Sequence, residues 1–276
     1  MSGDGAPARA SLAERYGPRA LILGGSEGIG AQFAALLAEA GLDLTLAARS
    51  AGPLNATAET IRRTYRVDVD VIELDLTAPG IASRAEEIIA ARDFGLVIYN
   101  AGATHGVNLF LDQPVDHALN LVALNCASPV AFAHAALTRM REKGRGGLLL
   151  VSSMSGLVGS GYVATYAASK SFEIVLAEGL HWELRRDGVD ILCAVASLTD
   201  TPAMQRSGMV AIEGLEPMDS RTFAAGAIDA LGTAPVWYAA GDAAVEALRA
   251  MPRPAATANA SAMSARLWGI KVDQDA

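Results

Sequence analysis

Short apolar runs alternate with longer stretches of helical periodicity along the chain. Each run is four to seven residues long and is bounded by turn-forming residues, and the runs lie at residues 20–23, 42–48, 69–74, 95–99, 147–152, 189–195 and 235–240. Short continuous runs of this kind are typical of strands buried on both faces. The pattern therefore predicts seven strands separated by helices.

The clearest helix lies between the first two runs. The stretch IGAQFAALLAEAG places Ile29, Phe33, Leu36 and Leu37 on one face, and Gly41 gives the helix a natural end. A strand, a helix and a strand in this order form a βαβ unit, and its repetition builds a parallel sheet with helices on both faces. We predict an α/β fold with a doubly wound sheet of about seven strands and a ligand site beyond their C-terminal ends.

The composition is that of a globular protein with a large core. Of the 276 residues, 51% are hydrophobic and 19% are charged. We expect one domain over residues 1–276, with a core over about residues 18–240 and a helical C-terminal extension over about residues 242–276. Only the first fifteen residues and residues 251–262 are loose in composition, and neither stretch resembles a domain linker.

Charge, cysteines and termini exclude several classes of function. The net charge of −8 argues against nucleic acid or an anionic membrane as the main partner. Cys126 falls in a predicted helix and Cys193 in a predicted strand, so both are expected to be buried free thiols. The first residues do not resemble a signal peptide, and we see no run of ~18 apolar residues, so we expect a cytoplasmic protein without a membrane helix. No HxH, HExxH or CxxC spacing predicts a metal site.

A glycine-rich loop follows the first strand. The stretch LGGSEGIG contains Gly24, Gly28 and Gly30, and the helix begins directly after it. A strand, turn and helix in this order let the backbone approach a pyrophosphate, while the helix N-terminus offers free N–H groups and a favourable dipole. A tight turn without a ligand is the alternative, but the context favours a dinucleotide.

The end of the second strand indicates which dinucleotide fits. An acidic residue there binds the ribose 2′-hydroxyl, whereas a nearby Arg accommodates a 2′-phosphate. Here Ala48 stands in the acidic position and Arg49 follows it, which favours NADP(H). NAD(H) stays open, because Arg49 can be a solvated surface residue and Glu27 in the glycine loop would oppose a phosphate if it points that way.

The stretch SSMSGLVGSGYVATYAASKS, residues 152–171, contains a second chemical signal. Tyr166 and Lys170 are four residues apart, so on a helix they share one face. An ammonium at ~4 Å and an effective dielectric of ~20 lowers the pKa of a phenol, ordinarily ~10, by roughly three units. Tyr166 would then give and take a proton near neutral pH.

These pieces together resemble the short-chain dehydrogenase/reductase family, in its smaller-subunit branch with a YxxxK active site, over about residues 18–240. The matches are GGSEGIG at 24–30, Asp75 after the third strand, NAG at 100–102, Asn125 in the next helix, and Ser153 thirteen residues before Tyr166. The resemblance implies a Rossmann-type fold and a catalytic tetrad of Asn125, Ser153, Tyr166 and Lys170. In that tetrad Ser153 polarises the substrate oxygen and Asn125 anchors a water in the proton path.

The resemblance also implies which residues surround the cofactor. Asp75 lies near the adenine, Lys170 holds the ribose hydroxyls, and Thr199 and Thr201 approach the nicotinamide amide and the phosphates. The full set is Gly24, Ser26, Glu27, Gly28, Ile29, Gly30, Arg49, Asp75, Leu76, Asn100, Ala101, Gly102, Tyr166, Lys170, Thr199 and Thr201.

Three positions depart from the family pattern. Leu23 replaces a threonine before the glycine loop, and Tyr99 replaces the first asparagine of NNAG; both changes look structural. Ala196 and Ser197 replace the Pro-Gly pair that runs beside the nicotinamide, which leaves the backbone path there open.

The sequence thus predicts an NADP(H)-preferring oxidoreductase that interconverts a carbonyl and a secondary alcohol on a small, apolar molecule. The alternatives are an NAD(H)-dependent alcohol dehydrogenase of the same family and a dinucleotide-binding sensor without catalysis. Tyr162 is followed four residues later by Tyr166 and not by a base, so we interpret it as lining the substrate cleft; the alternative is that it does not. Residues 202–218 are rich in Met and aliphatic side chains, which fits a mobile lid or a helix packed on the core.

The helix that carries Lys170 continues with more apolar surface than one sheet contact needs. Its extra apolar residues are Phe172, Val175, Leu176, Leu180 and Trp182. By the family resemblance, we expect this helix to pair with its copy in a homodimer or homotetramer.

Overall fold

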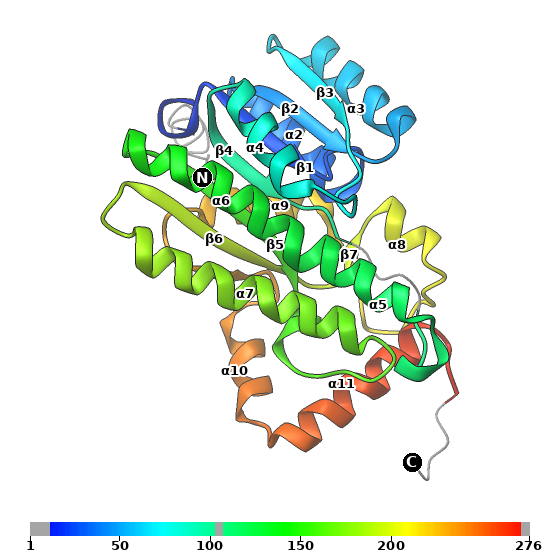
Figure 1. The fold of residues 1–276 in the computed structure, drawn as a ribbon. Coiled ribbons are helices and arrows are strands. Elements are labelled where there is room, and N and C mark those ends of the chain that lie inside the picture. Colours follow the sequence, from blue (N-terminus) through cyan, green and yellow to red (C-terminus); the bar gives the residue numbers. More distant parts are fainter. Residues whose placement is uncertain (1–11, 103–106, 272–276) are drawn as a thin grey trace, which may run out of the picture.

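A computed structural model of the protein describes residues 12–102 and 107–271. A sheet of seven parallel strands runs through its centre in the order β3-β2-β1-β4-β5-β6-β9 (Figure 1). The strands are β1 (Arg19–Leu23), β2 (Asp43–Ala48), β3 (Val69–Glu73), β4 (Phe94–Tyr99), β5 (Gly146–Ser153), β6 (Val189–Ala196) and β9 (Val236–Tyr238). The seven predicted strands are confirmed, with boundaries that differ by at most two residues.

The strand order reverses between β1 and β4. The chain builds the sheet outward from β1 to β3, then crosses back and continues from β4 to β9 on the other side. Leu23 pairs with Ala47 of β2 and with Tyr99 of β4, so these three strands end at one level. The loops that follow them therefore meet at the switch point, where doubly wound sheets bind their ligands.

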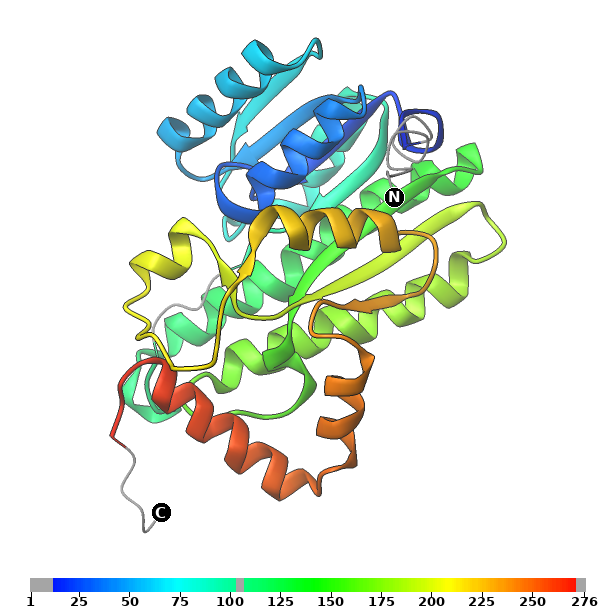
Figure 2. The same cartoon turned by 180° about the vertical axis from the view of Figure 1, so that it is seen from behind.

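Helices cover both faces of the sheet (Figures 1 and 2). Each layer buries its apolar stripe against one face and forms its own core cluster. One layer consists of α2 (Gly28–Glu39), α3 (Ala51–Thr64) and α9 (Ser220–Ala230), and the other of α4 (Ile81–Ala91), α6 (Ser128–Lys143) and α7 (Ala164–Leu184). In α2 the predicted stripe is confirmed: Phe33, Leu36 and Leu37 are buried, and Gly41 ends the helix with a φ of +87°.

The remaining elements surround the C-terminal ends of the strands. Short helical turns η1 (Phe110–Asp112) and η3 (Met154–Leu157) lie in loops. The helix α8 (Pro202–Arg206) lies between β7 (Thr199–Asp200) and β8 (Met218–Asp219), which pair in a separate two-stranded sheet. No residue from 202 to 218 is fully buried. The alternative of a core-packed helix over this segment is therefore wrong.

The C-terminal extension consists of α10 (Asp242–Ala250) and α11 (Arg253–Leu267). Residues 251–262, which look loose in composition, lie mostly in α11. Pro252 caps this helix, Pro254 stands in its first turn, and alanines follow. Proline is tolerated in a first helical turn and alanine is the strongest helix former, so the composition suits a helix after all.

One long helix bears on the prediction that the protein has no membrane helix. The helix α5 (Val115–Val122) continues through a π-helical turn (Ala123–Ala127) into α6. By length and composition alone, the stretch Val115–Lys143 could cross a membrane, and half of its most apolar window is buried inside the molecule. A core helix of a globular protein meets the same criterion.

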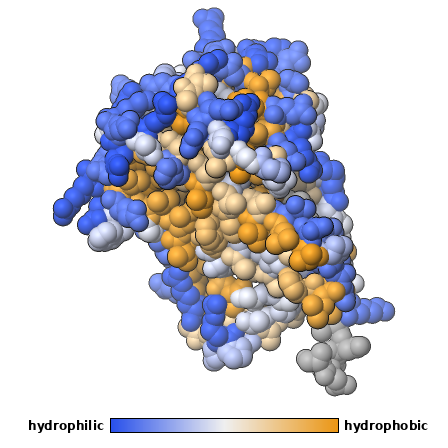
Figure 3. All heavy atoms as spheres, in the orientation of Figure 1, coloured by the Kyte–Doolittle hydropathy of each residue, from blue (hydrophilic) through white to orange (hydrophobic). Residues whose placement is uncertain are grey.

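An apolar face runs along the outside of α5, α6 and α7. Figure 3 shows hydrophobic side chains gathered over these helices. We define the apolar face by its exposed large members, which are Leu119, Val122, Val130, Phe172, Val175 and Trp182. Leu176 and Leu180 line a shallow groove on the same face of α7.

Candidate active site

The glycine loop leaves β1 and packs directly on the loop after β4. Gly24 has a φ of +84°, and a Cβ atom there would come within 2.8 Å of the Ala101 nitrogen. At Gly30, a Cβ atom would lie 1.9 Å from the Gly24 oxygen and 2.8 Å from Nδ2 of Asn100. The Asn100 amide donates a hydrogen bond of 2.9 Å to the Gly24 oxygen. Only glycine fits at these positions, which brings the backbone of the loop close to the N-terminus of α2.

The loop after β6 reaches the same place. A Cβ atom on Gly28 would lie 3.2 Å from Thr201, which precedes α8. The Ser26 oxygen accepts a hydrogen bond of 2.7 Å from the Thr57 hydroxyl of α3, and Ile29 packs on the core below α2. A glycine-rich backbone loop that leads into a helix N-terminus fits a dinucleotide pyrophosphate.

Arg49 and Asp75 follow the neighbouring strands β2 and β3. Arg49 is exposed directly after β2. Hydrogen bonds from the Thr77 hydroxyl and backbone, together with the charge of Arg49, lower the pKa of the Asp75 carboxyl. Leu76 beside it is buried. Asp75 is thus ionised and close enough to Arg49 for their charges to interact at the edge where the adenosine half would lie.

Glu27 of the glycine loop has a partner that the sequence does not reveal. Its carboxylate forms an ion pair with the guanidinium of Arg206 in α8, with one contact, Nη1 to Oε2, of 3.1 Å. The two residues are 179 positions apart. Glu27 therefore neither points freely to solvent nor presents an uncompensated charge to a phosphate.

The predicted catalytic residues come from β5, the π-helical turn and α7. Ser153 ends β5, and its Oγ accepts a hydrogen bond of 3.2 Å from the Ser155 nitrogen. Tyr166 is the third residue of α7 and Lys170 lies one turn later. The Lys170 Nζ is 6.0 Å from the centre of the Tyr166 ring, so the shared helical face predicted for the pair is confirmed.

Asn125 lies in the π-helical turn and is fully buried. Its Nδ2 donates a hydrogen bond of 2.9 Å to the Ser169 hydroxyl, while its Oδ1 has no hydrogen-bond partner among the described residues. A Cβ atom on Gly102 would lie 2.9 Å from Nζ of Lys170 and 3.4 Å from this Oδ1. The NAG loop, Asn125 and Lys170 thus meet at one point. An unsatisfied amide oxygen there fits the water-anchoring role that the resemblance implies.

Lys170 is itself held by a buried carboxylate. Its Nζ lies 2.9 Å from each carboxylate oxygen of Glu173 and 3.0 Å from the Val151 oxygen. Burial alone would lower the pKa of Lys170, but the charge of Glu173 reverses this and holds it above its ordinary value. The ammonium is therefore charged across the physiological range.

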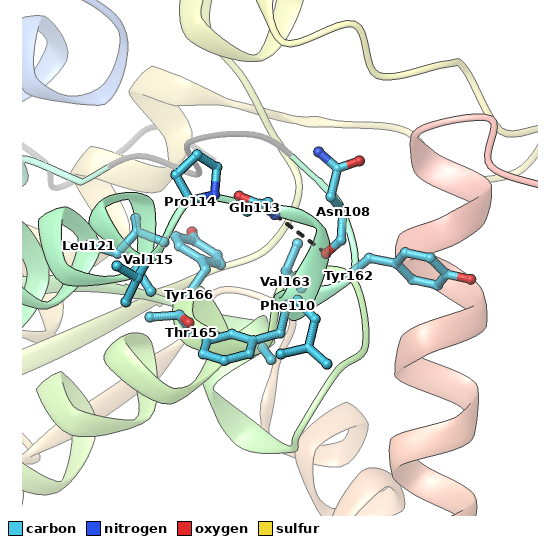
Figure 4. A pocket seen from close by; sticks show the side chains of 13 residues that line it. Asn108, Phe110, Gln113, Pro114, Val115, Leu121, Tyr162, Val163, Thr165 and Tyr166 are labelled. Carbon is cyan, nitrogen blue, oxygen red and sulfur yellow. Dashed lines mark hydrogen bonds between the residues drawn. The ribbon is translucent and has the colours of Figure 1, made fainter.

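Tyr166 borders a pocket of about 290 Å³ beside α5. Apolar side chains dominate its wall, namely Phe110, Leu111, Pro114, Val115, Leu121 and Val163. Tyr162 also borders the pocket, but Figure 4 shows its ring pointing away, towards α11. Both alternatives for Tyr162 are thus correct in part: its backbone belongs to the wall, and its ring does not enter the pocket.

The C-terminal helix fixes the loop that leads into Tyr166. The Gly161 nitrogen donates a hydrogen bond of 2.7 Å to the Ser261 hydroxyl, and the hydroxyls of Ser160 and Ser264 are 2.9 Å apart. Tyr162 at the end of this loop has a φ of +65°, which is uncommon for a residue other than glycine. The helix α11 therefore supports one wall of the pocket.

Comparison with known proteins decides the family. The model of the short chain dehydrogenase family matches residues 18–209. The chain belongs to the short-chain dehydrogenase family.

Other members show the same relationship. This short-chain dehydrogenase is 29% identical to a 7beta-hydroxysteroid dehydrogenase of Collinsella aerofaciens over 194 residues, which cover 70% of this chain and 73% of that protein. It is 30% identical to a very-long-chain 3-oxoacyl-CoA reductase of Coprinopsis cinerea, over 63% of this chain. The match spans about half, 52%, of the reductase.

Solved structures of the family have the same fold. One from a study of 7beta-hydroxysteroid dehydrogenase stereoselectivity aligns with a TM-score of 0.82 at 25% identity, covering 90% of this chain and 98% of that one. A short-chain dehydrogenase from Sphingobium yanoikuyae in complex with NADPH aligns with a TM-score of 0.76 at 26% identity, covering 94% and 98%. The predicted Rossmann-type fold is confirmed, and the short-chain dehydrogenase is an NAD(P)-dependent oxidoreductase that acts on CH–OH or C=O groups.

The three departures from the family pattern are accommodated locally. Leu23 and Tyr99 are buried at the ends of β1 and β4, and the Tyr99 hydroxyl donates a hydrogen bond of 2.6 Å to the Leu124 oxygen in the π-helical turn. At the third position, β6 simply continues to Ala196, and the Thr199 hydroxyl then donates a hydrogen bond of 3.0 Å to the Ser197 oxygen. Thr199 and Thr201 are thereby directed to the same edge of the sheet as the glycine loop.

Both cysteines are free, as predicted, with Cys193 buried in β6 and Cys126 half-buried in the π-helical turn. In the parts of the chain that the structure describes, no three side chains of the metal-binding types gather into a cluster. Sequence reasoning missed Glu173 and Arg206. Glu173 carries a signal, because a carboxylate three residues after a lysine on a helix commonly pairs with it, whereas Arg206 lies too far along the chain for any pattern to link it to Glu27.

Proposed function

We propose that this short-chain dehydrogenase interconverts an apolar ketone and its secondary alcohol, with NADP(H) preferred over NAD(H). One observation carries the proposal. Tyr166, the residue with the candidate proton-transferring phenol, borders a pocket whose other walls are mostly apolar, and Lys170 one turn later on the same helix lies against Gly102 of the NAG loop. A substrate in this pocket would lie between the phenol and the nucleotide edge of the sheet.

The chain's own residues then handle the proton. The nicotinamide, when bound, supplies or accepts the hydride at the carbon atom. In reduction, the Tyr166 phenol gives its proton to the substrate oxygen, and in oxidation the phenolate takes it back. Ser153 donates a hydrogen bond to the same oxygen and orients it, while the Lys170 ammonium stabilises the phenolate.

The pocket and the relatives point to a bulky apolar substrate class. The mouth of the pocket carries exposed aliphatic and aromatic side chains, and Leu111 there is 89% exposed. Apolar groups left in water at a pocket rim favour an apolar ligand that covers them. The relatives named above act on hydroxysteroids or long acyl chains, and a bulky-bulky ketone specific alcohol dehydrogenase of Comamonas testosteroni aligns with a TM-score of 0.72 at 27% identity.

The preference for NADP(H) rests on charge. Arg49 stands at the end of β2 without an acidic residue before it, and the Glu27 charge is compensated by Arg206. A guanidinium can fork two hydrogen bonds to a phosphate. The neighbour from Sphingobium yanoikuyae holds NADPH, which supports the same choice here. NAD(H) is the rival cofactor, whereas membership of a family of dehydrogenases sets the sensor alternative aside.

A ketone series tests the substrate class. We expect kcat/KM with NADPH to rise from acetone through 2-octanone to a steroid ketone, because each adds apolar area that the pocket and its rim remove from water. Nicotinamide absorbance at one pH gives the rates. A flat series, or a preference for charged ketones, would contradict the proposed substrate class.

A charge series tests the cofactor preference. We expect Arg49→Ala to lower the ratio of kcat/KM for NADPH over NADH by about tenfold or more. Arg206→Ala should lower the same ratio a few-fold by exposing the Glu27 charge, and Glu27→Gln in that background should restore it. A higher kcat/KM with NADH than with NADPH in the parent protein would replace this proposal with the NAD(H) rival.

A further inference from the structure

Two serines of α11 hold the loop over residues 158–163, which we call the wall loop. The Gly161 nitrogen donates a hydrogen bond of 2.7 Å to the Ser261 hydroxyl. The hydroxyls of Ser160 and Ser264, which are 6% and 9% exposed, are 2.9 Å apart. Ser261 and Ser264 are three residues apart and so lie on one side of the helix. Two consecutive residues of the wall loop are therefore bound to one side of α11.

The wall loop fits closely against α11. A Cβ atom on Gly161 would lie 3.2 Å from the Ser261 Oγ and 3.3 Å from its Cβ. A Cβ atom on Gly159 would lie 3.8 Å from the Thr257 hydroxyl oxygen. The Ser261 hydroxyl donates its own proton to the Thr257 oxygen, 2.7 Å away, within the helix. The same hydroxyl oxygen is thus left as an acceptor for the Gly161 N–H.

The helix α11 is itself attached near both ends. At its start, Arg253 donates a hydrogen bond of 3.0 Å to the Leu157 oxygen, directly before the wall loop. At its end, the Leu267 oxygen accepts a hydrogen bond of 2.8 Å from the Val210 nitrogen, in the segment after α8. Because other contacts hold the helix, the loss of one serine hydroxyl should release the wall loop and leave α11 in place.

The wall loop transmits this support to the substrate pocket. Tyr162 and Val163 belong to the pocket wall directly before α7 and its Tyr166 (Figure 4). The Tyr162 oxygen accepts a hydrogen bond of 3.1 Å from the nitrogen of Asn108, which begins the pocket rim, residues 108–111. Tyr162 also has a φ of +65°, a conformation that persists only where surrounding contacts maintain it. Hydrogen bonds thus connect α11, through the wall loop, to the rim.

We propose that Ser261 and Ser264 are positioning residues that determine how bulky a ketone the pocket accepts, because they hold the wall loop and the rim in place. This role rests on the proposed function, since it concerns the ketone specificity of the same pocket. The helix α11 lies outside residues 18–209, which match the family model, so the assignment depends on the contacts above and not on the family pattern.

The physical reason is the cost of ordering a loop during binding. A bulky ketone contacts the wall loop and the rim as well as Tyr166, so it binds best when both are already fixed. If α11 no longer holds them, ordering them costs conformational entropy, and this cost opposes binding of the bulky ketone. A small ketone contacts only the groups near Tyr166, which the helix α7 positions by itself.

Hydrogen exchange tests the support without cofactor or substrate. In Ser261→Ala and in Ser264→Ala, we expect the peptide of residues 158–163 to exchange about threefold faster or more, because its amide groups open more often. The peptide of residues 107–113 should follow it, because the Asn108 nitrogen is bound to the wall loop. Unchanged exchange in either peptide would overturn the inference.

Two further variants show whether the effect belongs to the serine hydroxyl. Ser261→Thr keeps a hydroxyl and should restore the slow exchange of the parent. Asn259→Ala is the matched control, because Asn259 is exposed on the same helix and its amide lies 3.6 Å from the Met251 sulfur, away from the wall loop. Faster exchange of the wall loop in Asn259→Ala, by as much as in Ser261→Ala, would contradict a role specific to the serines.

Kinetics with two ketones test the specificity. In Ser261→Ala we expect the KM for a steroid ketone to rise about fivefold, the size of one lost hydrogen bond. The kcat for that ketone, the kcat/KM for acetone and the Kd for NADPH should stay within about twofold of the parent values. An equal loss for both ketones would overturn the inference. A parent protein that turns over no ketone would instead count against the proposed function, and hydrogen exchange would still decide whether α11 holds the pocket wall.

Discussion

At the residue scale, Lys170 links the candidate catalytic residue Tyr166 to a buried carboxylate. Its ammonium contacts Glu173 and the Val151 oxygen and lies beside the Tyr166 ring. Removing the lysine therefore does two separate things: it takes away the stabilisation of the phenolate, and it leaves a buried carboxylate without its counter-charge. The second effect is measurable without any substrate.

We expect Lys170→Met to destabilise the protein in a pH-dependent way. An unpaired buried carboxylate costs about 3–5 kcal/mol when ionised, and Glu173, whose pKa burial already raises to about 7, will have a still higher pKa in the variant. A carboxyl whose pKa is higher in the folded than in the unfolded chain contributes stability at low pH and loses it as pH rises. The loss in free energy of unfolding should thus be larger at pH 8 than at pH 5.5, as measured by urea unfolding.

Lys143→Met is the matched control for this experiment. Lys143 forms an exposed ion pair with Asp93 and should change the free energy of unfolding by less than about 1 kcal/mol at either pH. An equal loss at pH 8 and pH 5.5 in Lys170→Met would contradict the assignment of Glu173 as a buried partner.

Spacing in the sequence predicts which residues contact each other only where a helix, or the end of a strand, fixes which residues are neighbours. Tyr166 and Lys170 are four apart on one helix, and Asn100 directly follows β4 beside the glycine loop, so both contacts could be foreseen. The pairing of Glu27 with Arg206 could not, because it depends on the path of the chain after β6. The catalytic roles of Asn125, Ser153, Tyr166 and Lys170 stay predictions until variants are measured.

At the scale of elements, the backbone of the glycine loop packs directly against neighbouring backbone, with no room for a side chain between them. The Gly30 position at the start of α2 leaves no room for a side chain beside the Gly24 oxygen and Asn100. We expect Gly30→Ala to lower the free energy of unfolding by about 1–3 kcal/mol and to weaken NADPH binding by tenfold or more, because the loop must move away from its place.

Gly52→Ala provides the comparison on a neighbouring helix. A Cβ atom on Gly52 meets nothing within 4 Å in α3, so this change should leave NADPH binding intact and raise stability by about 0.5–1 kcal/mol. Unfolding curves and NADPH fluorescence titrations measure both effects. Normal NADPH affinity in Gly30→Ala would show that the glycine loop is not built as described.

Elements with a strong apolar pattern were predictable and irregular ones were not. The strands are buried on both faces and so appear as unbroken apolar runs. The π-helical turn around Asn125 leaves no trace in the periodicity, because one extra residue in a turn shifts the pattern too little. The C-terminal extension was expected to be helical, but no apolar pattern marked the bounds of α11, because this helix contains mostly Ala and small polar residues and packs through contacts such as that between Ser264 and Ser160.

At the scale of the whole molecule, the apolar face along α5, α6 and α7 leaves large hydrophobic side chains exposed on one side of the described structure (Figure 3). We propose that two copies pair through this face. Val175 and Trp182 are 63% and 65% exposed on α7, and burying such side chains gives about 25 cal/mol for each Å² removed from water. That the chain forms a single domain and lies in the cytoplasm also stays a prediction.

The assembly can be tested by a charge placed on that face. We expect Val175→Asp to convert a dimer or tetramer into a species of 28.5 kDa in light scattering at micromolar concentration, because pairing would bury the carboxylate. Val210→Asp, on an exposed valine outside the apolar face, should leave the assembly unchanged. A parent protein that is already monomeric would rule the pairing out.

The central claim is that the Tyr166 phenol transfers the proton, and Tyr166→Phe tests it most directly. The variant keeps the ring and loses only the hydroxyl, so with NADPH and a bulky apolar ketone at pH 7 we predict that kcat falls by about 10²-fold or more. The Kd for NADPH should stay within a few-fold of the parent value. Tyr162→Phe, whose ring points away from the pocket, should keep most of the activity. A Tyr166→Phe protein that retains more than about a tenth of the parent kcat would contradict the account.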